Sequence, residues 1–325
     1  MFPMSRRCVI TVGDLGEFGV IARIARRLPQ GESVLLGPGD DAAVVKAPDG
    51  RVVVTTDLLI EGRHFRRDWS SAYDVGRKAA AQNLSDIAAM GAIPTTLVVG
   101  LGMPGDVPVD WVERLADGFR EECEVVGASV AGGDIARSEL VVIGVTALGD
   151  LAGHAPVTRS GARPGQVVAY AGRLGYAAAG LALLGAGIVP TGGPLLEAVE
   201  GHRRPRPPYR SGPEAARLGA TAMLDVSDGL LQDLGHVAEA SGVGISLEPG
   251  AFPVGEPVAA AAKELGTDPL DWILSGGEDH ALAAIFPSEV RLPPHWTIVG
   301  RVIDGAKVQV SGRATGPGGW DHFRA

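Results

Sequence analysis

Acidic side chains recur at the edges of apolar segments along this chain of 325 residues, and they limit how the chain can fold. Asp86 lies between Leu84 and Ile87, and Asp57 directly precedes Leu58, so each is expected to face a core or a cleft. Burying a carboxylate without a partner costs on the order of several kcal/mol, so the fold must bring a compensating partner to these positions. The acidic strings contain Asp40 and Asp41, Thr55 to Asp57, Asp86, Asp134, Asp225 to Asp228, and Glu278 with Asp279.

The string DVSDGLLQDLGHVAE at residues 225–239 places two aspartates and a serine at the entrance of an apolar stripe with helical spacing. One interpretation is helix capping, because the side chains of Asp225, Ser227 and Asp228 can accept hydrogen bonds from the first N–H groups of a helix. The other is a turn that binds a divalent metal, since Mg²⁺ takes carboxylate and hydroxyl oxygens and Gly229 allows close backbone approach. This string alone leaves both interpretations open.

All the acidic strings together favour metal binding. Cationic residues lie mostly outside them, and a ligand set made only of oxygen atoms favours several Mg²⁺ ions over zinc. Such a cluster suits phosphoryl transfer, which requires neutralised phosphate oxygens and an aligned donor and acceptor. The sequence has neither a G-x-x-x-x-G-K-[ST] loop nor a G-x-G-x-x-G turn between a strand and a helix. It therefore predicts a nucleotide site of another design.

Composition narrows the class of protein. The formal charge of −9 argues against a nucleic-acid partner, which would require a basic face. Cys8 and Cys123 are too few for a disulfide framework, so a reducing cytoplasm is expected. The longest uncharged stretch, residues 174–196, is rich in glycine and predicts a core helix and a loop, and we expect no association with a membrane.

Periodicity predicts alternating helices and strands, and hence an α/β or α+β architecture in two halves. A loop rich in Gly, Pro and Arg at residues 153–166 predicts domains at 1–152 and 153–325. The basic, proline-rich segment at residues 201–212 is interpreted as a surface loop. Helices are expected at 18–27, 72–90, 111–126, 176–184 and from Asp228, and strands at 52–60, 95–101, 140–148, 167–171, 281–286 and 297–302.

The strings come in the order found in one enzyme family. GDDAAVV, TTDLLIEGRHF, NLSDIAAMGA, GGDIARS, TRSGARPG, DVSDGLLQDLGH, LSGGEDHAL and GWDHF resemble the successive motifs of the thiamine-monophosphate kinases. The resemblance implies transfer of the γ-phosphoryl group of ATP to thiamine monophosphate, giving thiamine diphosphate and ADP. It also implies a homodimer, in which the N-terminal α/β domains form a shared β-barrel, and a C-terminal α/β domain.

The same resemblance implies residue roles. ATP would contact Gly133, Asp134, Arg159 and Ser227, and thiamine monophosphate would contact His64, Glu278 and Trp320. Asp57 and Asp134 would be indispensable for catalysis. The magnesium ligands would be Asp41, Thr55, Thr56, Asp57, Asp86, Asp134, Asp225 and Asp228.

Three positions depart from the motifs of the resembled family. Ile135 follows GGD where threonine is usual, His280 follows GGED where tyrosine is common, and Trp320 replaces a smaller aromatic residue. Two other functions stay open: a sister ATP-dependent synthetase that activates an amide oxygen by phosphorylation, and a protein that binds magnesium and nucleotide without turnover.

Overall fold

The structure is a computed structural model that describes residues 10–37 and 43–313, and it confirms the mixed α/β architecture. Two compact units share the chain. One comprises Met1–Lys46, Thr56–Ala80 and Thr95–Ala147, and the other comprises Ala47–Thr55, Ala81–Pro94 and Leu148–Ala325. Segments of the two units alternate along the chain. The single domain boundary at residue 152 that the sequence predicted stays a prediction.

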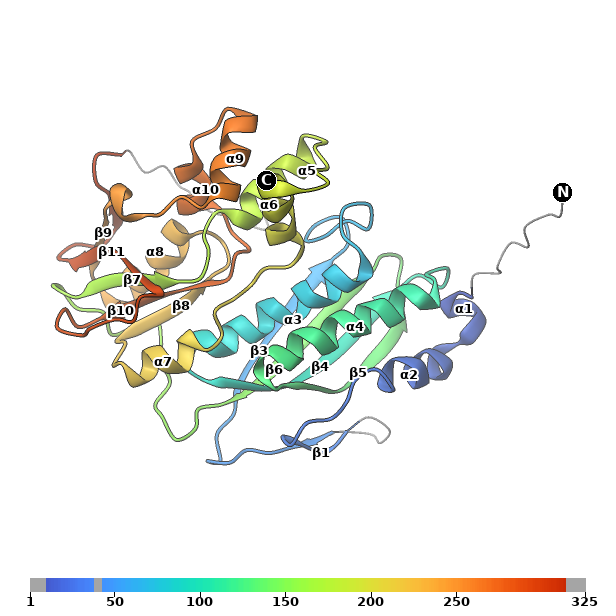
Figure 1. The fold of residues 1–325 in the computed structure, drawn as a ribbon. Coiled ribbons are helices and arrows are strands. Elements are labelled where there is room, and N and C mark those ends of the chain that lie inside the picture. The colour runs from blue at the N-terminus through green and yellow to red at the C-terminus, as the bar shows by residue number, and fades with distance from the viewer. Residues whose placement is uncertain (1–9, 38–42, 314–325) are drawn as a thin grey trace. The chain divides into compact units, whose positions relative to one another are not determined.

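A four-stranded sheet contains β3 (Val53–Ile60), β6 (Val142–Asp150), β4 (Ile93–Met103) and β5 (Ser129–Arg137), in that order. Strands β4 and β5 run parallel, with Gly100 opposite Asp134. Helices α3 (Ala72–Ala89) and α4 (Val109–Val126) cover one face of this sheet (Figure 1). The predicted strands and helices of this region are confirmed to within about two residues, except that β5 was not predicted. The remaining elements are α1 (Val12–Leu15), α2 (Glu17–Ala25), β1 (Val34–Leu36) and β2 (Val44–Val45).

Helices α3 and α4 cross at a pair of glycines. A Cβ atom added at Gly76 would lie 2.2 Å from the carbonyl oxygen of Leu115, and one added at Gly118 would lie 2.2 Å from that of Tyr73. Any side chain here would collide with backbone that a rotamer change cannot move. The glycines therefore set how closely the two helices approach.

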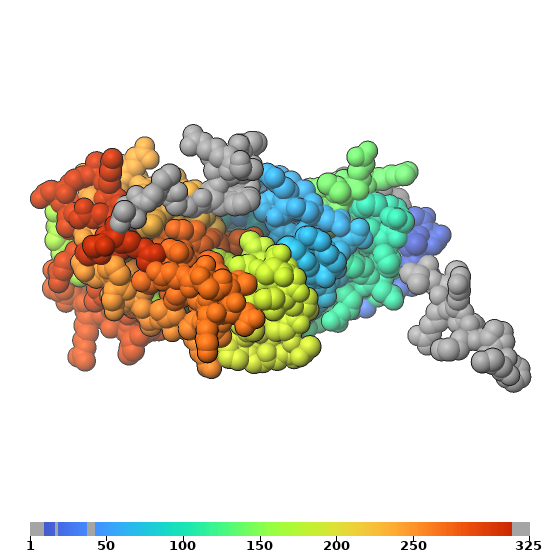
Figure 2. Space-filling view, turned by 90° about the horizontal axis from the view of Figure 1, so that it is seen from above, coloured from blue at the N-terminus to red at the C-terminus, as the bar shows by residue number. Residues whose placement is uncertain are grey.

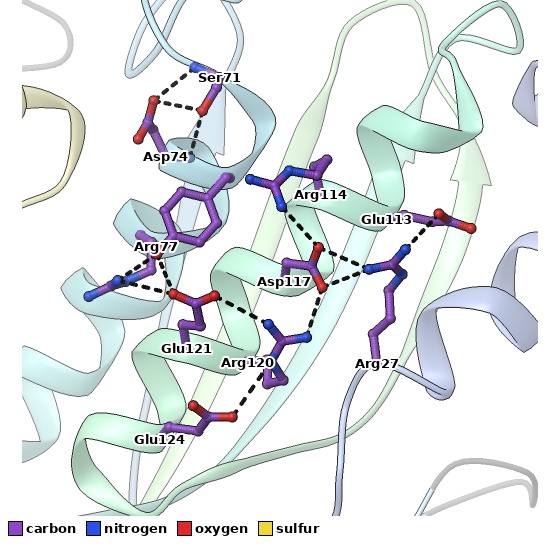
Figure 3. A network of polar contacts seen from close by, with 11 residues as sticks. Arg27, Ser71, Asp74, Arg77, Glu113, Arg114, Asp117, Arg120, Glu121 and Glu124 are labelled. Atoms are coloured by element: carbon purple, nitrogen blue, oxygen red, sulfur yellow. Dashed lines mark hydrogen bonds and ion pairs between the residues drawn. The ribbon is translucent and has the colours of Figure 1, made fainter. Parts of the chain in front are cut away.

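A network of ion pairs joins α3 and α4 to Arg27, which follows α2 (Figure 3). Asp117 of α4 is buried, and Arg27 Nη1 donates to both of its carboxylate oxygens at 2.8 and 2.9 Å. Arg120 Nη1 adds a third hydrogen bond at 2.8 Å. Burial raises the pKa of Asp117, but the hydrogen bond from Arg27 and the neighbouring cations outweigh it and lower the pKa below its ordinary value. The folded structure thus stabilises this carboxylate in its charged form.

We expect Asp117→Ala to lower the free energy of unfolding by about 2 kcal/mol, because it removes a buried acceptor and leaves Arg27 and Arg120 without it. Glu124→Ala is the matched control, since Glu124 is 60% exposed and lies 3.6 Å from Arg120 Nε. An exposed pair of this kind contributes less than about 1 kcal/mol. Urea unfolding of both variants measures the difference, and equal losses would contradict the role given to Asp117.

A six-stranded sheet in the second unit has the order β12, β9, β11, β7, β10, β8. Strands β7 (Val167–Ala171), β8 (Ala222–Val226) and β10 (Ala281–Phe286) are buried along their whole length. Uninterrupted burial explains why β7 and β10 read as continuous apolar runs in the sequence, and both begin and end where predicted. The other strands are β9 (Gly244–Leu247), β11 (Trp296–Ile303) and β12 (Val308–Val310).

Helix α8 (Leu230–Ser241) packs against β8 and β9, while α9 (Glu256–Leu265) packs on α5 (Tyr176–Gly185) and α6 (Gly193–Arg203). In Figure 2 the orange α9 region adjoins the yellow-green α5 and α6 region on one surface. Helix α7 (Ser211–Arg217), the 3₁₀ turn Pro249–Ala251 and α10 (Pro269–Ser275) complete the unit. Among the described residues, no helix combines the length and apolar character needed to cross a bilayer.

The predicted loop at residues 201–212 is wrong at both of its ends. Its first residues continue α6 to Arg203, and its last residues begin α7 at Ser211. The connecting residues 204–210 bury Pro205 and Pro207 and expose Arg206. Pro213 obscured the start of α7, because a proline disfavours helix at the residue before it, whereas Pro205 agrees with the end of α6 at Arg203.

Candidate active site

Strand β3 places its two threonines on opposite faces. Because side chains alternate along a strand, Thr55 and Asp57 face one side and Thr56 faces the other. Thr55 Oγ1 donates a hydrogen bond of 2.7 Å to Asp86 Oδ2 of α3. Thr56 Oγ1 donates to the carbonyl oxygen of Val145 at 3.0 Å on β6. The structure thus pairs two predicted magnesium ligands, Thr55 and Asp86, and directs the Thr56 side chain elsewhere.

His64 follows β3 in a tight turn. The amide of Ile60 donates to His64 Nδ1 at 3.0 Å, so the neutral ring carries its proton on Nε2. The buried Lys78 of α3 donates from Nζ to the carbonyl oxygen of His64 at 3.0 Å. These contacts fix both the backbone and the ring orientation of the predicted substrate residue.

Gly133 and Asp134 lie exposed in β5. A Cβ atom at Gly133 would lie 1.9 Å from the carbonyl oxygen of Val99, so only glycine permits β4 and β5 to approach here. The register of the two strands shifts between Leu97 and Val98, just before this point. Glycine at 133 therefore has a packing reason that does not depend on a nucleotide.

The second unit brings together two strings that lie about 50 residues apart in the sequence. The amide of Glu278 donates to the carbonyl oxygen of Ser227 at 2.8 Å. A Cβ atom at Gly277 would lie 2.3 Å from that oxygen, and one at Gly229 would lie 2.5 Å from the carbonyl oxygen of Ser275. Glycines in both strings thus let the DVSDG turn and the SGGEDH segment touch through their backbones.

The capping interpretation of the 225–228 string is wrong. Helix α8 begins at Leu230, and its N-cap position is taken by Gly229, which has no side chain, rather than by Asp225, Ser227 or Asp228. Instead Asp233, from its first turn, accepts the amides of Asp228 and Gly229 at 3.1 and 3.0 Å. Burial, followed by the charges of Asp225 and Asp228, raises the pKa of Asp233 to about 7. The carboxylates therefore lie close enough to repel one another, which is the condition that a bound cation relieves.

The segment from Glu278 to His280 is strained and anchored at each side chain. Glu278 and His280 have φ angles of 65° and 53°, which non-glycine residues rarely adopt. Glu278 Oε2 lies 3.3 Å from Nδ1 of the buried His202, and His280 Nδ1 lies 2.9 Å from Asp225 Oδ2. Asp279 accepts the amides of Gly175 and Ala177 at the start of α5. Contacts with α5, α6 and β8 thus hold the strained segment in place.

Asp279 predicts a pH dependence of stability. Burial raises its pKa to about 7 from 3.8, although its two amide donors oppose the shift. Between these values the folded state binds a proton that the unfolded state has released, so stability falls as pH rises toward 7. Asp279→Ser cannot titrate, so its stability deficit relative to the wild type should shrink by about 2 kcal/mol between pH 5 and pH 8. Urea midpoints at the two pH values measure this, and a constant deficit would refute it.

The other predicted site residues are Arg159, Asp41 and Trp320. Arg159 is exposed, and its carbonyl oxygen accepts Ser241 Oγ at 3.2 Å, which ties its loop to the end of α8. Asp41 and Trp320 lie outside the described residues. Within residues 10–37 and 43–313, no three His, Cys, Asp or Glu side chains form a ready-made metal cluster. The donors present, Asp86 with Thr55 and Asp225 near Asp228, are oxygen atoms and fit Mg²⁺ in kind.

Sequence reasoning missed His202 and Asp233 at this site, and it noted His280 without its contact to Asp225. Asp233 carries a detectable signal, because it falls on the buried stripe of α8 with Leu230 and Leu234. A carboxylate in a helical core stripe requires a partner. The two histidines carry no comparable signal, since the residues they contact lie at least 55 positions away.

Comparison with known proteins shows which domains and which chains are similar to this one. Residues 39–151 match the N-terminal domain of the AIR synthase related proteins, and residues 163–313 match their C-terminal domain. The thiamine-monophosphate kinase of Mycobacterium tuberculosis is 52% identical over 96% of this chain and 93% of that protein. The thiamine-monophosphate kinase of Corynebacterium glutamicum is 46% identical over 86% of this chain and 85% of that protein.

One similar solved structure holds two ligands. AaThiL complexed with AMPPCP and TMP superposes with a TM-score of 0.79 at 32% identity, covering 99% of this chain and all of that one. Together with the two matched domains, this supports the two-domain α/β fold.

Proposed function

This chain belongs to the thiamine-monophosphate kinases, and from that premise we propose that its oxygen ligands hold the magnesium ions of an in-line phosphoryl transfer. The enzyme transfers the γ-phosphoryl group of ATP to thiamine monophosphate and releases ADP. The observation that carries the magnesium proposal is the group of carboxylates at the DVSDG turn, Asp225, Asp228 and Asp233. The charges of Asp225 and Asp228, after burial, raise the pKa of Asp233, and a cation bound at the turn would relieve this repulsion.

We assign the magnesium ions to residues that present oxygen atoms. Thr55 and Asp86 form one pair, and Asp225 with Asp228 forms another. When bound, the ions would neutralise the phosphate oxygens of donor and acceptor. The full proposed ligand set is Asp41, Thr55, Thr56, Asp57, Asp86, Asp134, Asp225 and Asp228, in which Thr56 would contribute its backbone oxygen because its side chain faces the other side of β3.

The contacts with the two substrates are proposed residue by residue from the family motifs. We propose that ATP contacts Gly133, Asp134, Arg159 and Ser227, with Arg159 supplying a guanidinium to the phosphates. Thiamine monophosphate would contact His64, Glu278 and Trp320, and the Glu278 carboxylate would offset the positive charge of the thiazolium ring. Asp57 and Asp134 are proposed as the indispensable acids.

The reaction needs no general base from the protein. A phosphate monoester is largely ionised at neutral pH, so an acceptor oxygen can attack the γ-phosphorus without first losing a proton. One O–P bond forms, the bond to the β-phosphate oxygen breaks, and ADP leaves. The protein binds the two substrates, aligns the acceptor oxygen with the γ-phosphorus and excludes water.

A homodimer is proposed from the exposed face of the four-stranded sheet. Leu58 and Val98 are 57% and 37% exposed, and Gly100 and Gly144 flatten the same face. An apolar face of this kind suits a second copy of the sheet, as in the β-barrel that the family resemblance implies. We also propose domain boundaries at 1–152 and 153–325 and a cytoplasmic location, where ATP is available.

ADP release with MgATP tests the function, using thiamine monophosphate, free thiamine and no acceptor. We expect thiamine diphosphate from the monophosphate alone. No ADP release in any of the three reactions would contradict the kinase and favour a sister synthetase that needs an acceptor of its own. Stabilisation by ligands without ADP release would indicate a binding protein without turnover.

A further inference from the structure

His280 is held rigidly against Asp225. Both residues are buried, and the ring Nδ1 lies 2.9 Å from Asp225 Oδ2. The amide of His280 donates to the carbonyl oxygen of Val226 at 3.0 Å, and its own carbonyl oxygen accepts Ser85 Oγ at 3.4 Å. Its φ of 53° shows that the fold imposes an unfavourable backbone conformation to place this ring.

The hydrogen bond requires a donor at Nδ1. An ionised carboxylate only accepts, so Nδ1 must carry the proton, and either a neutral or a charged ring can supply it. One oxygen of Asp225 is thereby engaged, and its carboxylate plane is fixed. A fixed carboxylate binds a cation better than a rotating one, because partners of a metal ligand orient it and typically contribute about 10- to 100-fold in metal affinity.

We propose that His280 is a positioning residue that orients Asp225 for magnesium through its Nδ1–H donor. This inference rests on the proposed function, in which Asp225 is a magnesium ligand. Tyrosine, which is common here in the motif that the chain resembles, could not make the same contact from the same backbone. Its hydroxyl lies across the ring, whereas Nδ1 is only two bonds beyond Cβ.

Two amide variants test whether a donor at the position of Nδ1 is required or whether any polar side chain at residue 280 is sufficient. In His280→Asn the amide nitrogen is two bonds beyond Cβ, as Nδ1 is, while in His280→Gln it is one bond farther away. Asparagine also tolerates positive φ. His280→Phe keeps a ring without any donor and provides a second variant if the glutamine variant folds poorly.

The experiment measures Mn²⁺ binding by electron paramagnetic resonance, with the full chain and the non-hydrolysable ATP analogue AMPPCP. We expect Mn²⁺ affinity to fall about tenfold in His280→Gln and His280→Phe and to stay within about threefold of wild type in His280→Asn. The magnesium concentration for half-maximal rate should rise in His280→Gln and His280→Phe and change little in His280→Asn. Melting temperatures of the variants without metal should not follow this order.

Several outcomes would overturn the proposal. Wild-type Mn²⁺ affinity in both His280→Gln and His280→Phe would show that the ring does not position Asp225. An equal loss in all three variants, including His280→Asn, would show a structural role only. Failure of the proposed function gives a different result: wild type would bind no Mn²⁺ with AMPPCP, or Asp225→Asn would bind it unchanged.

Discussion

Replacing Asp57 by asparagine is expected to lower kcat/KM for thiamine monophosphate by about 100-fold or more, the largest effect on activity that we predict. Asparagine preserves the size of the side chain and removes its charge. Asp57 shares the face of β3 on which Thr55 contacts Asp86, so its carboxylate belongs to the side of the strand with a predicted ligand pair. The loss should be accompanied by a higher magnesium requirement, because a neutral amide is a weaker ligand for a hard cation.

Steady-state kinetics across a magnesium titration measure this effect. Asp110→Asn is the matched control, because it makes the same chemical change at an exposed position in the first turn of α4. We expect the control to stay within about twofold of wild type, since surface substitutions away from functional sites have small effects. Unchanged turnover and magnesium dependence in Asp57→Asn would show that Asp57 is not a ligand.

The periodic elements of the fold could be predicted because their patterns are local. Strands β7 and β10 are continuous apolar runs, and the helix over residues 72–89 repeats apolar side chains at helical spacing. Strand β5 was missed because Gly132 and Gly133 interrupt its alternation, and the structure shows that the second glycine is required by its contact with Val99. Helix α6 was missed because it begins with Gly193 and Pro194.

Of the residues at the site, the acidic ones could be predicted from the sequence, but most of their contacts could not. The sequence identified Asp86 as a carboxylate in apolar surroundings and Asp225 as a member of an acidic string, and each has a partner in the structure. Their partners, Thr55 and His280, lie 31 and 55 residues away. The family motif supplied Thr55, but His280 was noted only as a departure from tyrosine. Pairings across such distances follow from strand order and loop contacts, which periodicity does not encode.

Replacing Gly118 by alanine is expected to produce the largest loss of stability that we predict. The added Cβ would lie 2.2 Å from the carbonyl oxygen of Tyr73 and 3.1 Å from Cα of Gly76, so α3 and α4 must separate. In an open helix, glycine to alanine stabilises by about 1 kcal/mol. Here the overlap is with backbone, and we expect a net loss of about 3 kcal/mol, at the upper end of the usual cost of overpacking.

Gly235→Ala provides the matched control, because Gly235 lies inside α8 and an added Cβ would meet nothing within 4 Å. The same substitution should there be neutral or stabilise by up to about 1 kcal/mol, through helix propensity and the lower entropy of the unfolded chain. Urea unfolding of the two variants should therefore shift the midpoint in opposite directions. If Gly118→Ala were as stable as Gly235→Ala, the helices could separate at little cost, and close packing at Gly76 and Gly118 would not hold them together.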